Sequence, residues 1–431
     1  MISRPFESTL QLDPPAAAAP GWLRNGIWAL ADQGLFAGAN FVANVLLAKL
    51  LSPVEYGAFT IALTTFLLLG TIHTALLTEP MLVFGPVRYR NHMAGYLRAL
   101  LWGHALVSGA FGAMLIAAGL ACRILHMASI GNALLCLAFS QPLVLLLWLM
   151  RRACYLEASP RKAAFGGMLY LVLVVAGIAS LNRRLSVMSS LGVMAAASLV
   201  CAALIWISLT GGRDDAFPGP SRHAVTLVHW EYGRWAAVSA ALGFIPWNIY
   251  YYVLPLFTDL AATATLKAMV NITLPVLQAT SALLPLLLPA LVRRRGTPSF
   301  ARLLHTAAGW TAAGLSAFWL VAGAFHSLVI REIYRDRYVE ASSLLWIVGA
   351  LPVAAGLSAV WSTALRAEED PRGVFYATLV AALISMSLGM VLTARDGVRG
   401  AATGIVAYFA ISAGVLWFRW TQRESSRLSA C

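Results

Sequence analysis

Long apolar stretches follow one another along almost the whole of this 431-residue chain, with only short polar connections between them. Each is roughly 20 residues long, the length that an α-helix needs to cross the hydrocarbon core of a bilayer. Twelve such spans are predicted, at residues 26–50, 58–83, 97–120, 130–150, 163–181, 187–209, 235–257, 262–290, 303–325, 341–365, 374–394 and 400–420. Backbone polar groups in lipid must be bonded within the segment, and no alternating pattern suggests a β-barrel. The predicted fold class is an all-α integral membrane protein.

The composition excludes a water-soluble globular domain. Hydrophobic residues make up 60% of the chain and charged residues only 11%, too few to cover a surface that faces water. The net charge of +13 could indicate nucleic-acid binding, but the basic residues stand singly or in short clusters at helix ends and form no continuous patch. No nucleic-acid partner is therefore predicted.

The basic residues predict an orientation in the membrane. When the 31 lysines and arginines are assigned to alternate sides of twelve spans, one side collects 21 and the other 10. The rich side holds Arg4, Arg24, Arg88, Arg90, Arg98, Arg151, Arg152, Arg161, Lys162, Arg213, Arg222, Arg234, Arg293–Arg295, Arg302, Arg366, Arg372, Arg419, Arg423 and Arg427. The positive-inside rule makes this side cytoplasmic. A multi-pass protein of the bacterial inner membrane is predicted, with both termini inside.

The chain repeats itself at an offset of about half its length. Pro160 and Pro371 follow similar segments 211 positions apart, and Arg24 and Arg234 stand 210 apart at the entrances to the first and seventh spans. Two pseudo-symmetric six-helix lobes are predicted. The predicted parts are a disordered cytoplasmic tail at 1–23, lobes at 24–209 and 232–421, a cytoplasmic linker at 210–231 and a second tail at 422–431. The five cysteines lack the spacing of zinc ligands or a CxxC motif, so no metal site is predicted.

Polar residues inside the spans indicate where a hydrated lumen could lie, because they are costly against lipid. At 100° per residue, Gln33, Asn40 and Asn44 fall within about 40° of one another, with Asp32 beside them. In the second half Asn248 shares a face with Arg234, and the next span presents Lys267, Asn271 and Gln278 on one face.

Each of these groups also has a structural interpretation. Amides and the threonines of the second span could simply hydrogen-bond between helices. Glu79 could pair with Arg88 or Arg90 at the cytoplasmic end, and Lys267 could extend outward toward the interface. Asp32 lies deeper in its span, roughly 12 Å beyond Arg24, and a carboxylate there calls for a functional reason.

Several segments resemble the polysaccharide flippases of the multidrug/oligosaccharidyl-lipid/polysaccharide (MOP) exporter superfamily. The most specific is the Leu-Ser-Pro-x-Glu-Tyr-Gly motif at residues 51–57, which follows Trp-Ala-Leu-Ala-Asp-Gln-Gly at residues 28–34. Further matches are Glu-Pro-Met at 79–81, Phe-Gly-Pro at 84–86, Arg151-Arg152 before Tyr155, and Ile-Tyr-Arg-Asp-Arg-Tyr at 333–338. The resemblance covers about residues 24–420.

The resemblance implies flipping of an undecaprenyl-pyrophosphate-linked oligosaccharide across the membrane for exopolysaccharide or O-antigen synthesis, by alternating access. Arg24 and Arg234 are then candidate pyrophosphate-binding residues, since arginine suits charge-assisted bonds to phosphate. Candidate sugar-binding residues are Gln33, Asn40, Asn44, Asn248, Lys267, Asn271 and Gln278. No cofactor is expected. Proton or sodium coupling is left open, with Asp32 and Glu79 as candidate sites, and a polysaccharide polymerase and export machinery are candidate partners beside membrane lipids.

Two other classes of function are weighed against this one. A cation-coupled drug antiporter of the same superfamily would share the fold, and Asp32 could be its ion site. A membrane enzyme of polysaccharide assembly is a third hypothesis, but the sequence has no P-loop, metal-ligand spacing or nucleophile constellation. The sequence does not identify the sugar, the energy source or the oligomeric state.

Overall fold

The computed structural model describes residues 22–210 and 219–430, and the elements it assigns there are all helices. The first six-helix bundle contains α1 (Trp22–Leu50), α2 (Pro53–His73), η1 (Thr74–Thr78), α3 (Glu79–Arg88), η2 (Arg90–His92), α4 (Met93–Ile124), α5 (Ala128–Leu156), α6 (Pro160–Leu181), η3 (Asn182–Arg184) and α7 (Val187–Thr210). The second contains α8 (Arg222–Phe257), α9 (Leu260–Val292), α10 (Pro298–Ala324), α11 (His326–Tyr334), η4 (Val339–Leu344), α12 (Leu345–Val348), α13 (Leu351–Ala367), α14 (Pro371–Asp396) and α15 (Val398–Ala430).

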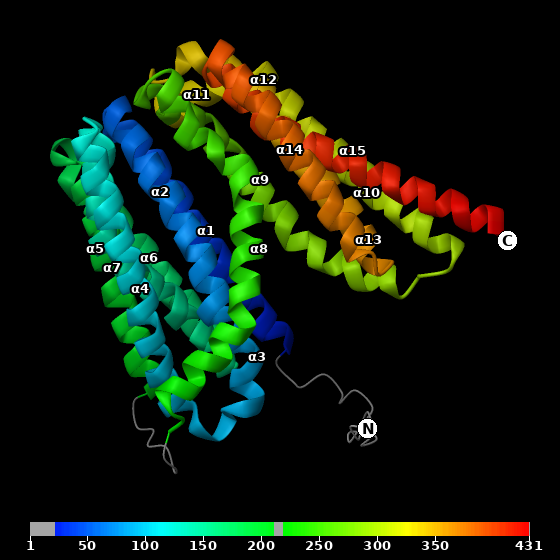
Figure 1. Cartoon of the computed structure of the whole chain (residues 1–431). Coiled ribbons are helices and arrows are strands. Elements are labelled where there is room, and N and C mark those ends of the chain that lie inside the picture. Colours follow the sequence, from blue (N-terminus) through cyan, green and yellow to red (C-terminus); the bar gives the residue numbers. More distant parts are fainter. Residues whose placement is uncertain (1–21, 211–218, 431) are drawn as a thin grey trace.

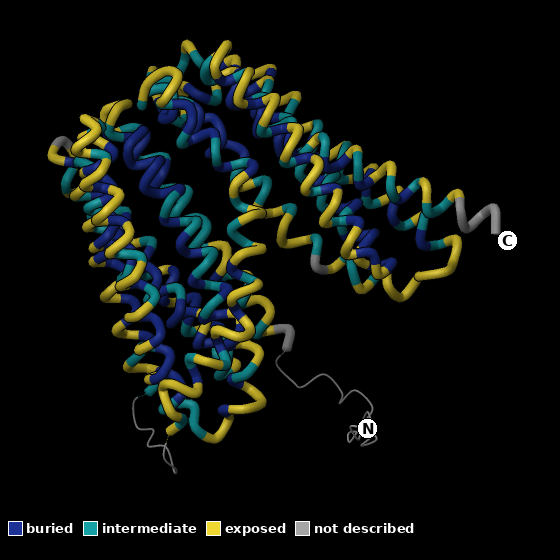
Figure 2. Tube along the Cα trace, in the orientation of Figure 1, coloured by how far each residue is buried: buried dark blue, intermediate teal, exposed yellow. Residues whose placement is uncertain are grey.

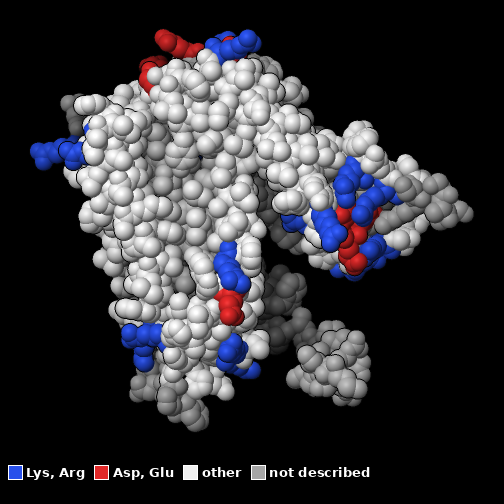
Figure 3. All heavy atoms as spheres, viewed as in Figure 1, with Lys and Arg blue, Asp and Glu red and all other residues white. Residues whose placement is uncertain are grey.

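The prediction of twelve membrane spans is confirmed by the length and composition of the helices. Twelve helical runs among the described residues are long and apolar enough to cross a membrane. Some join shorter elements, such as Pro53–Arg88, which runs through α2, η1 and α3. Large apolar side chains such as Trp310, Phe139 and Leu286 are more than 70% exposed, as expected for a surface that faces lipid. Most charged atoms visible in Figure 3 lie toward the ends of the bundles.

The two bundles meet at one end and separate toward the other. In Figure 1 the ends of α2 and α9 lie together, while the far ends of the two bundles diverge. The first half of α9 is mostly buried, whereas Pro275, Gln278 and Ala279 in its middle are exposed. Figure 2 shows how burial changes along the helices of both bundles. Figure 3 shows the open cleft that this divergence leaves. We call the two ends the closed end and the open end; α1 begins at the open end.

The internal repeat is visible in the backbone. Pro160 and Pro371 each occupy the first turn of the fifth long helix of a bundle, α6 and α14. Proline suits this position because its missing N–H would have no partner there. The residues two positions earlier, Ala158 and Glu369, both have a positive φ, of 47° and 60°. The same unusual turn therefore recurs 211 residues apart, as the sequence echo predicted.

Several helix boundaries differ from the predicted spans, most of all in α8. This helix begins at Arg222, so the predicted linker at 210–231 contains its first turns and the seventh span does not begin at residue 235. The polar residues that made this segment resemble a loop are used in packing: the guanidinium of Arg222 lies 5.6 Å from the ring centre of Trp102 on α4. Likewise α15 continues to Ala430 through the predicted tail at 422–431. The tail predicted at 1–23 lies outside the described residues, except that α1 begins at Trp22.

Candidate functional site

The Leu-Ser-Pro-x-Glu-Tyr-Gly motif forms a tight helix start at the closed end. Ser52 is the N-cap of α2: the backbone N–H of Glu55 donates to the Ser52 hydroxyl at 3.2 Å, and the Ser52 N–H donates to the Glu55 carboxylate at 3.3 Å. Such a reciprocal capping box satisfies two amide groups that the first turn would leave free. Pro53 occupies the first helical position. The motif thereby fixes how α2 leaves α1.

The two residues that end the motif contact the second bundle directly. Asn271 Nδ2 donates a hydrogen bond of 2.8 Å to the Tyr56 hydroxyl, and both side chains are fully buried. Gly57 lies so close to Leu260 of α9 that a Cβ on it would stand 2.0 Å from the Leu260 carbonyl oxygen. Only a small residue permits such an approach between helices.

An arginine of the second bundle completes this contact by bonding to the end of α1. Arg337 Nη1 donates to the carbonyls of Ala48, at 3.3 Å, and of Leu51. A guanidinium stabilises these free carbonyls, which carry the negative end of the helix dipole. We call the group Tyr56, Gly57, Leu260, Asn271 and Arg337 the closed junction.

The first half of α8 packs against the first bundle as well. The Tyr96 hydroxyl and His229 Nε2 are 2.8 Å apart, and His229 Nδ1 lies 3.3 Å from the Leu76 carbonyl. Gly233 sits against Ala75 and Leu76. Both belong to the π-turn η1, whose loosened hydrogen bonding exposes carbonyls to α8. In its second half α8 bonds to the other bundle: the Tyr250 hydroxyl donates to the Ser385 carbonyl at 2.7 Å.

Four candidate site residues are exposed on the parts of α1, α8 and α9 that lie away from the closed junction. They are Arg24, Gln33, Arg234 and Gln278. Neither arginine forms an ion pair with another described residue, and Arg234 lies 5.6 Å from the ring centre of Trp235. Glu79, at the start of α3, is also exposed and makes no ion pair with Arg88 or Arg90 in the described part of the chain.

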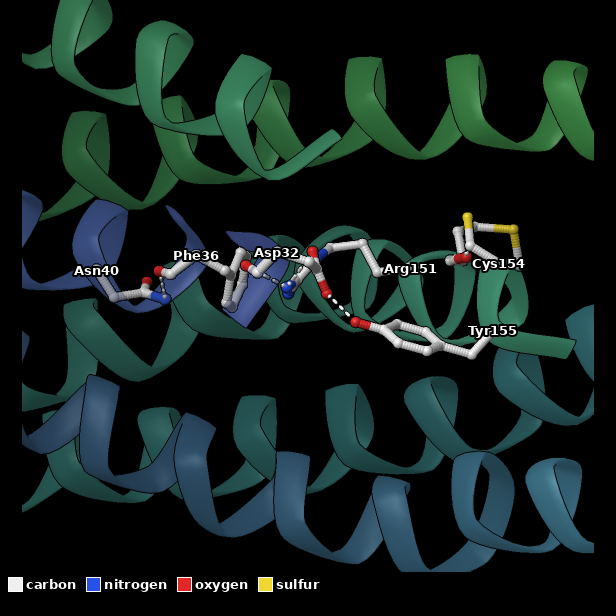
Figure 4. Close-up of polar contacts among 7 residues, drawn as sticks. Asp32, Phe36, Asn40, Arg151, Cys154 and Tyr155 are labelled. Atoms are coloured by element: carbon white, nitrogen blue, oxygen red, sulfur yellow. Dashed lines mark hydrogen bonds and ion pairs between the residues drawn. The ribbon is translucent and has the colours of Figure 1, made fainter. Parts of the chain in front are cut away.

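Asp32 is neither exposed nor free. Its carboxylate oxygen Oδ1 accepts hydrogen bonds from Arg151 Nη2 at 2.7 Å and Nε at 3.0 Å, and Oδ2 accepts one from the Tyr155 hydroxyl at 2.8 Å (Figure 4). The Asp32 residue is 1% exposed and Arg151 is 7% exposed. The guanidinium lies 3.8 Å from the centre of the Phe36 ring, within cation–π distance. Removing either charge would leave the other buried without an opposite charge.

Sequence reasoning assigned Arg151 to the cytoplasmic ends of the spans and did not connect it with Asp32. The two residues are 119 positions apart, and a count of basic residues treats every arginine near a helix end alike. The available signal was spacing: Arg151 and Tyr155 stand one helical turn apart on α5, so both can point at one carboxylate. Gly167 of α6 packs against this group: a Cβ placed on it would lie 3.6 Å from Asp32 Oδ1, an ordinary van der Waals contact.

The other amides of the predicted stripes are bonded within their own helices. Asn40, Asn44 and Asn248 each donate to the carbonyl four residues earlier, at 3.0, 2.8 and 2.9 Å. Asn40 is half-buried and the other two are buried. Threonines 60, 64, 71 and 78 of the second span do the same. These side chains therefore bond along their own helices in this conformation, and these hydrogen bonds are not the bonds between helices that the structural interpretation expected.

Lys267 does not extend outward to the interface, as one interpretation of the sequence expected. It is 7% exposed, and its Nζ lies 5.7 Å from the ring centre of Tyr251 on α8. It forms no hydrogen bond or ion pair with any described residue. A lone buried lysine is costly in its charged form, so its presence calls for a function.

A separate ion-pair cluster lies at the open end of the second bundle. Asp370, the N-cap of α14, accepts hydrogen bonds from Arg419 Nε at 2.8 Å and from the Gly373 N–H at 2.9 Å, and Arg423 Nη2 lies 3.0 Å away. Burial opposes ionisation, but these bonds and charges together lower the pKa of the Asp370 carboxyl. Nearby, Arg295 bonds to Glu369 at 2.6 Å and lowers the pKa of that carboxyl.

The described residues contain no group of three or more histidine, cysteine, aspartate or glutamate side chains that could hold a metal ion. Cys122, Cys136, Cys154 and Cys201 are free thiols. The site is therefore built from ion pairs, amides, tyrosines and unpaired cations, which can bind polar or charged molecules.

The fold is that of the MOP transporters. The sequence matches no family model and no curated protein. A multidrug resistance MATE family transporter of the MOP superfamily in an inward-facing conformation is similar with a TM-score of 0.71 and 14% identity, over 93% of this chain and 99% of that one. The lipid II flippase MurJ in an inward closed conformation is similar with a TM-score of 0.71 and 14% identity, over 92% of this chain and 87% of that one. A multidrug resistance MATE family transporter in an outward-facing conformation has a TM-score of 0.64 and 14% identity, over 94% of this chain and 95% of that one.

Proposed function

We propose that this protein is a flippase that carries an undecaprenyl-pyrophosphate-linked oligosaccharide across the bacterial inner membrane by alternating access. The observation that carries the proposal is the pairing of a closed junction with an open cleft between two similar bundles. Directed bonds such as Asn271 to Tyr56 join α9 to α2 at the closed end, whereas the first half of α8 bonds to the first bundle away from this end. Such an arrangement can rock about a central site, exposing it to each side in turn.

The exposed residues near the open end suit a polar, anionic headgroup. Arg24 and Arg234 are exposed and unpaired in the described structure, and Gln33 and Gln278 are exposed primary amides. Such groups are costly against hydrocarbon, so we assign them to the hydrated cleft. The arginines would bind the pyrophosphate, and the amides would replace water on sugar hydroxyls. The polyprenyl tail would stay in the lipid.

The orientation follows from the positive-inside rule and is part of the proposal. It places the open end and both termini in the cytoplasm, the side on which the lipid-linked donor is assembled. The conformation described here would then receive the substrate. A polysaccharide polymerase and export machinery would use the product on the opposite side.

A cation-coupled drug antiporter would share this fold, and Asp32 was the candidate ion site for it. In the structure Arg151 and Tyr155 already bind both carboxylate oxygens of Asp32. A coupling ion would have to displace the guanidinium from a buried pair, at a cost of several kcal/mol. This pairing favours the flippase over the antiporter, and it favours a positioning role for Asp32.

The experiment replaces Arg24 and Arg234 by alanine, singly and together, and measures flipping of a purified undecaprenyl-pyrophosphate oligosaccharide in proteoliposomes. We expect strong loss in each single variant and partial rescue by lysine, which keeps the charge but loses the planar fork. Arg294→Ala is the matched control, since Arg294 is exposed and, among the described residues, its guanidinium bonds to the Ala290 carbonyl of its own helix end. Flipping at the normal rate by the double alanine variant would refute the proposed binding role.

A further inference from the structure

A stripe of buried polar side chains on α9 runs into the closed junction and is poorly supplied with partners among the described residues. On successive turns of α9, Thr263 Oγ1 and Asn271 Oδ1 are buried and have no hydrogen-bond partner in the described part of the chain, and Lys267 lies between them. Residues four apart share one face of a helix. Three under-satisfied groups on one face indicate a surface that meets water in another conformation of the protein.

Lys267 dominates this stripe because it can carry a full charge. The Tyr251 ring attracts an ammonium group but offers no hydrogen-bond acceptor to it along its face. Tyr56 and Asn271, one turn away, are already bonded to each other. An ammonium group is therefore poorly accommodated while the junction is closed, whereas an uncharged amine is tolerated.

No described residue forms an ion pair that compensates the charge of Lys267. The titratable groups on the helices packed around this part of α9 are chiefly Tyr56 on α2, Tyr251 on α8, Tyr334 on α11 and Tyr338 before η4. Phenols are uncharged near neutral pH.

The charged side chains in this region have other partners or positions. Arg337 bonds to the end of α1, where Lys49 adds a second positive charge. Glu340 lines a separate polar pocket beside Thr265, together with Asp396 and Arg399 of the α14–α15 turn. None of them forms an ion pair with Lys267 among the described residues.

We propose that Lys267 is a proton-binding switch of the closed junction. When the bundles part at this end, the amine meets water from the far side and binds a proton through its lone pair, becoming an ammonium. When they close again, the N–H bond breaks and the proton passes to the water that leaves the junction. The inference rests on alternating access but not on the identity of the substrate.

The sign of the pH dependence follows from which state holds the proton. The open junction binds one more proton than the closed junction, so lowering the pH favours opening. Because the two states differ by a single proton, the ratio of open to closed molecules changes by at most about tenfold per pH unit.

The test measures the junction itself. Spin labels at Val54 on α2 and Phe257 on α8, both exposed, report the separation of the bundles at this end in lipid nanodiscs between pH 5 and 9. We expect the fraction of molecules that show the longer distance to increase as the pH falls. Lys267→Gln should hold the junction closed, and Lys267→Arg, which stays charged, should hold it open, each without pH dependence. Lys162→Gln is the matched control, because Lys162 bonds to the Ser208 carbonyl at the open end.

Two results would overturn the inference. One is a pH dependence that survives in both Lys267 variants, which would assign the proton to another group such as the buried pair His73 and His104. The other is opening that follows the kind of anion in the buffer and ignores pH, which would make Lys267 an anion site. Neither result depends on an oligosaccharide, so failure here is distinct from failure of the proposed substrate.

Discussion

The approach of Gly57 to Leu260 supports a sharp prediction about the conformational equilibrium. A methyl group on Gly57 would lie 2.0 Å from the Leu260 carbonyl oxygen and 2.7 Å from its carbonyl carbon. Carbon–oxygen contacts between helices normally measure about 3.3 Å or more, so α2 and α9 must separate by more than about 1 Å. Such overpacking costs about 1–3 kcal/mol.

This cost falls only on the conformation in which the junction is closed. Gly57→Ala should therefore raise the ratio of open to closed molecules by about 5- to 150-fold. Spin labels at Val54 and Phe257 would show it as growth of the longer distance at constant pH. Gly38→Ala is the control, since a Cβ on Gly38 of α1 has no neighbour within 4 Å. Both substitutions replace glycine by alanine within a helix, so both gain the same helix propensity. An unchanged distance distribution in Gly57→Ala would refute the packing argument.

Three further predictions concern other parts of the chain. Asp32→Asn and Arg151→Met should each lower stability by about 3–5 kcal/mol in detergent unfolding, while the double variant should recover most of the loss; additive losses would contradict a mutual pair. Asp370→Asn should destabilise at pH 7 but progressively less below about pH 4, because a lowered pKa adds stability above the unfolded value and loses it as the pH falls through the folded value; an equal loss at pH 3 and pH 7 would exclude that origin. Impermeant thiol reagents applied from outside should label single cysteines in the Arg331–Glu340 segment and spare those at Arg293–Arg295; the reverse pattern would invert the orientation.

The elements that depend on local pattern could be predicted from the sequence. Hydropathy gives the twelve spans because lipid imposes a length and a composition on every crossing helix. The turns before Pro160 and Pro371 were predicted as equivalent because proline and its neighbours act within a few residues. The Ser-Pro-x-Glu motif likewise encodes its own capping box.

The parts that depend on distant partners could not be predicted. Asp32 was predicted to lie beside the polar stripe of the first span as a candidate cation-coupling site, and its pairing with Arg151 was missed because Arg151 comes from another helix. Lys267 has the same sequence environment whether it extends to the interface or lies buried, and only the position of α2 and α8 decides between them. The early start of α8 was missed for a related reason, since His229 is accommodated by Tyr96 of a different bundle.

The path of α8 means that the two bundles are not simply the two halves of the chain. The first half of this helix lies against α4 and η1 of the first bundle, and the second half lies against the other bundle. During synthesis, six helices of the first half would enter the membrane with this face uncovered. Tyr96 and the Leu76 carbonyl gain their histidine only when the seventh long helix arrives. A polypeptide cut between α7 and α8 would therefore yield an N-terminal fragment that requires its other half to complete its own packing.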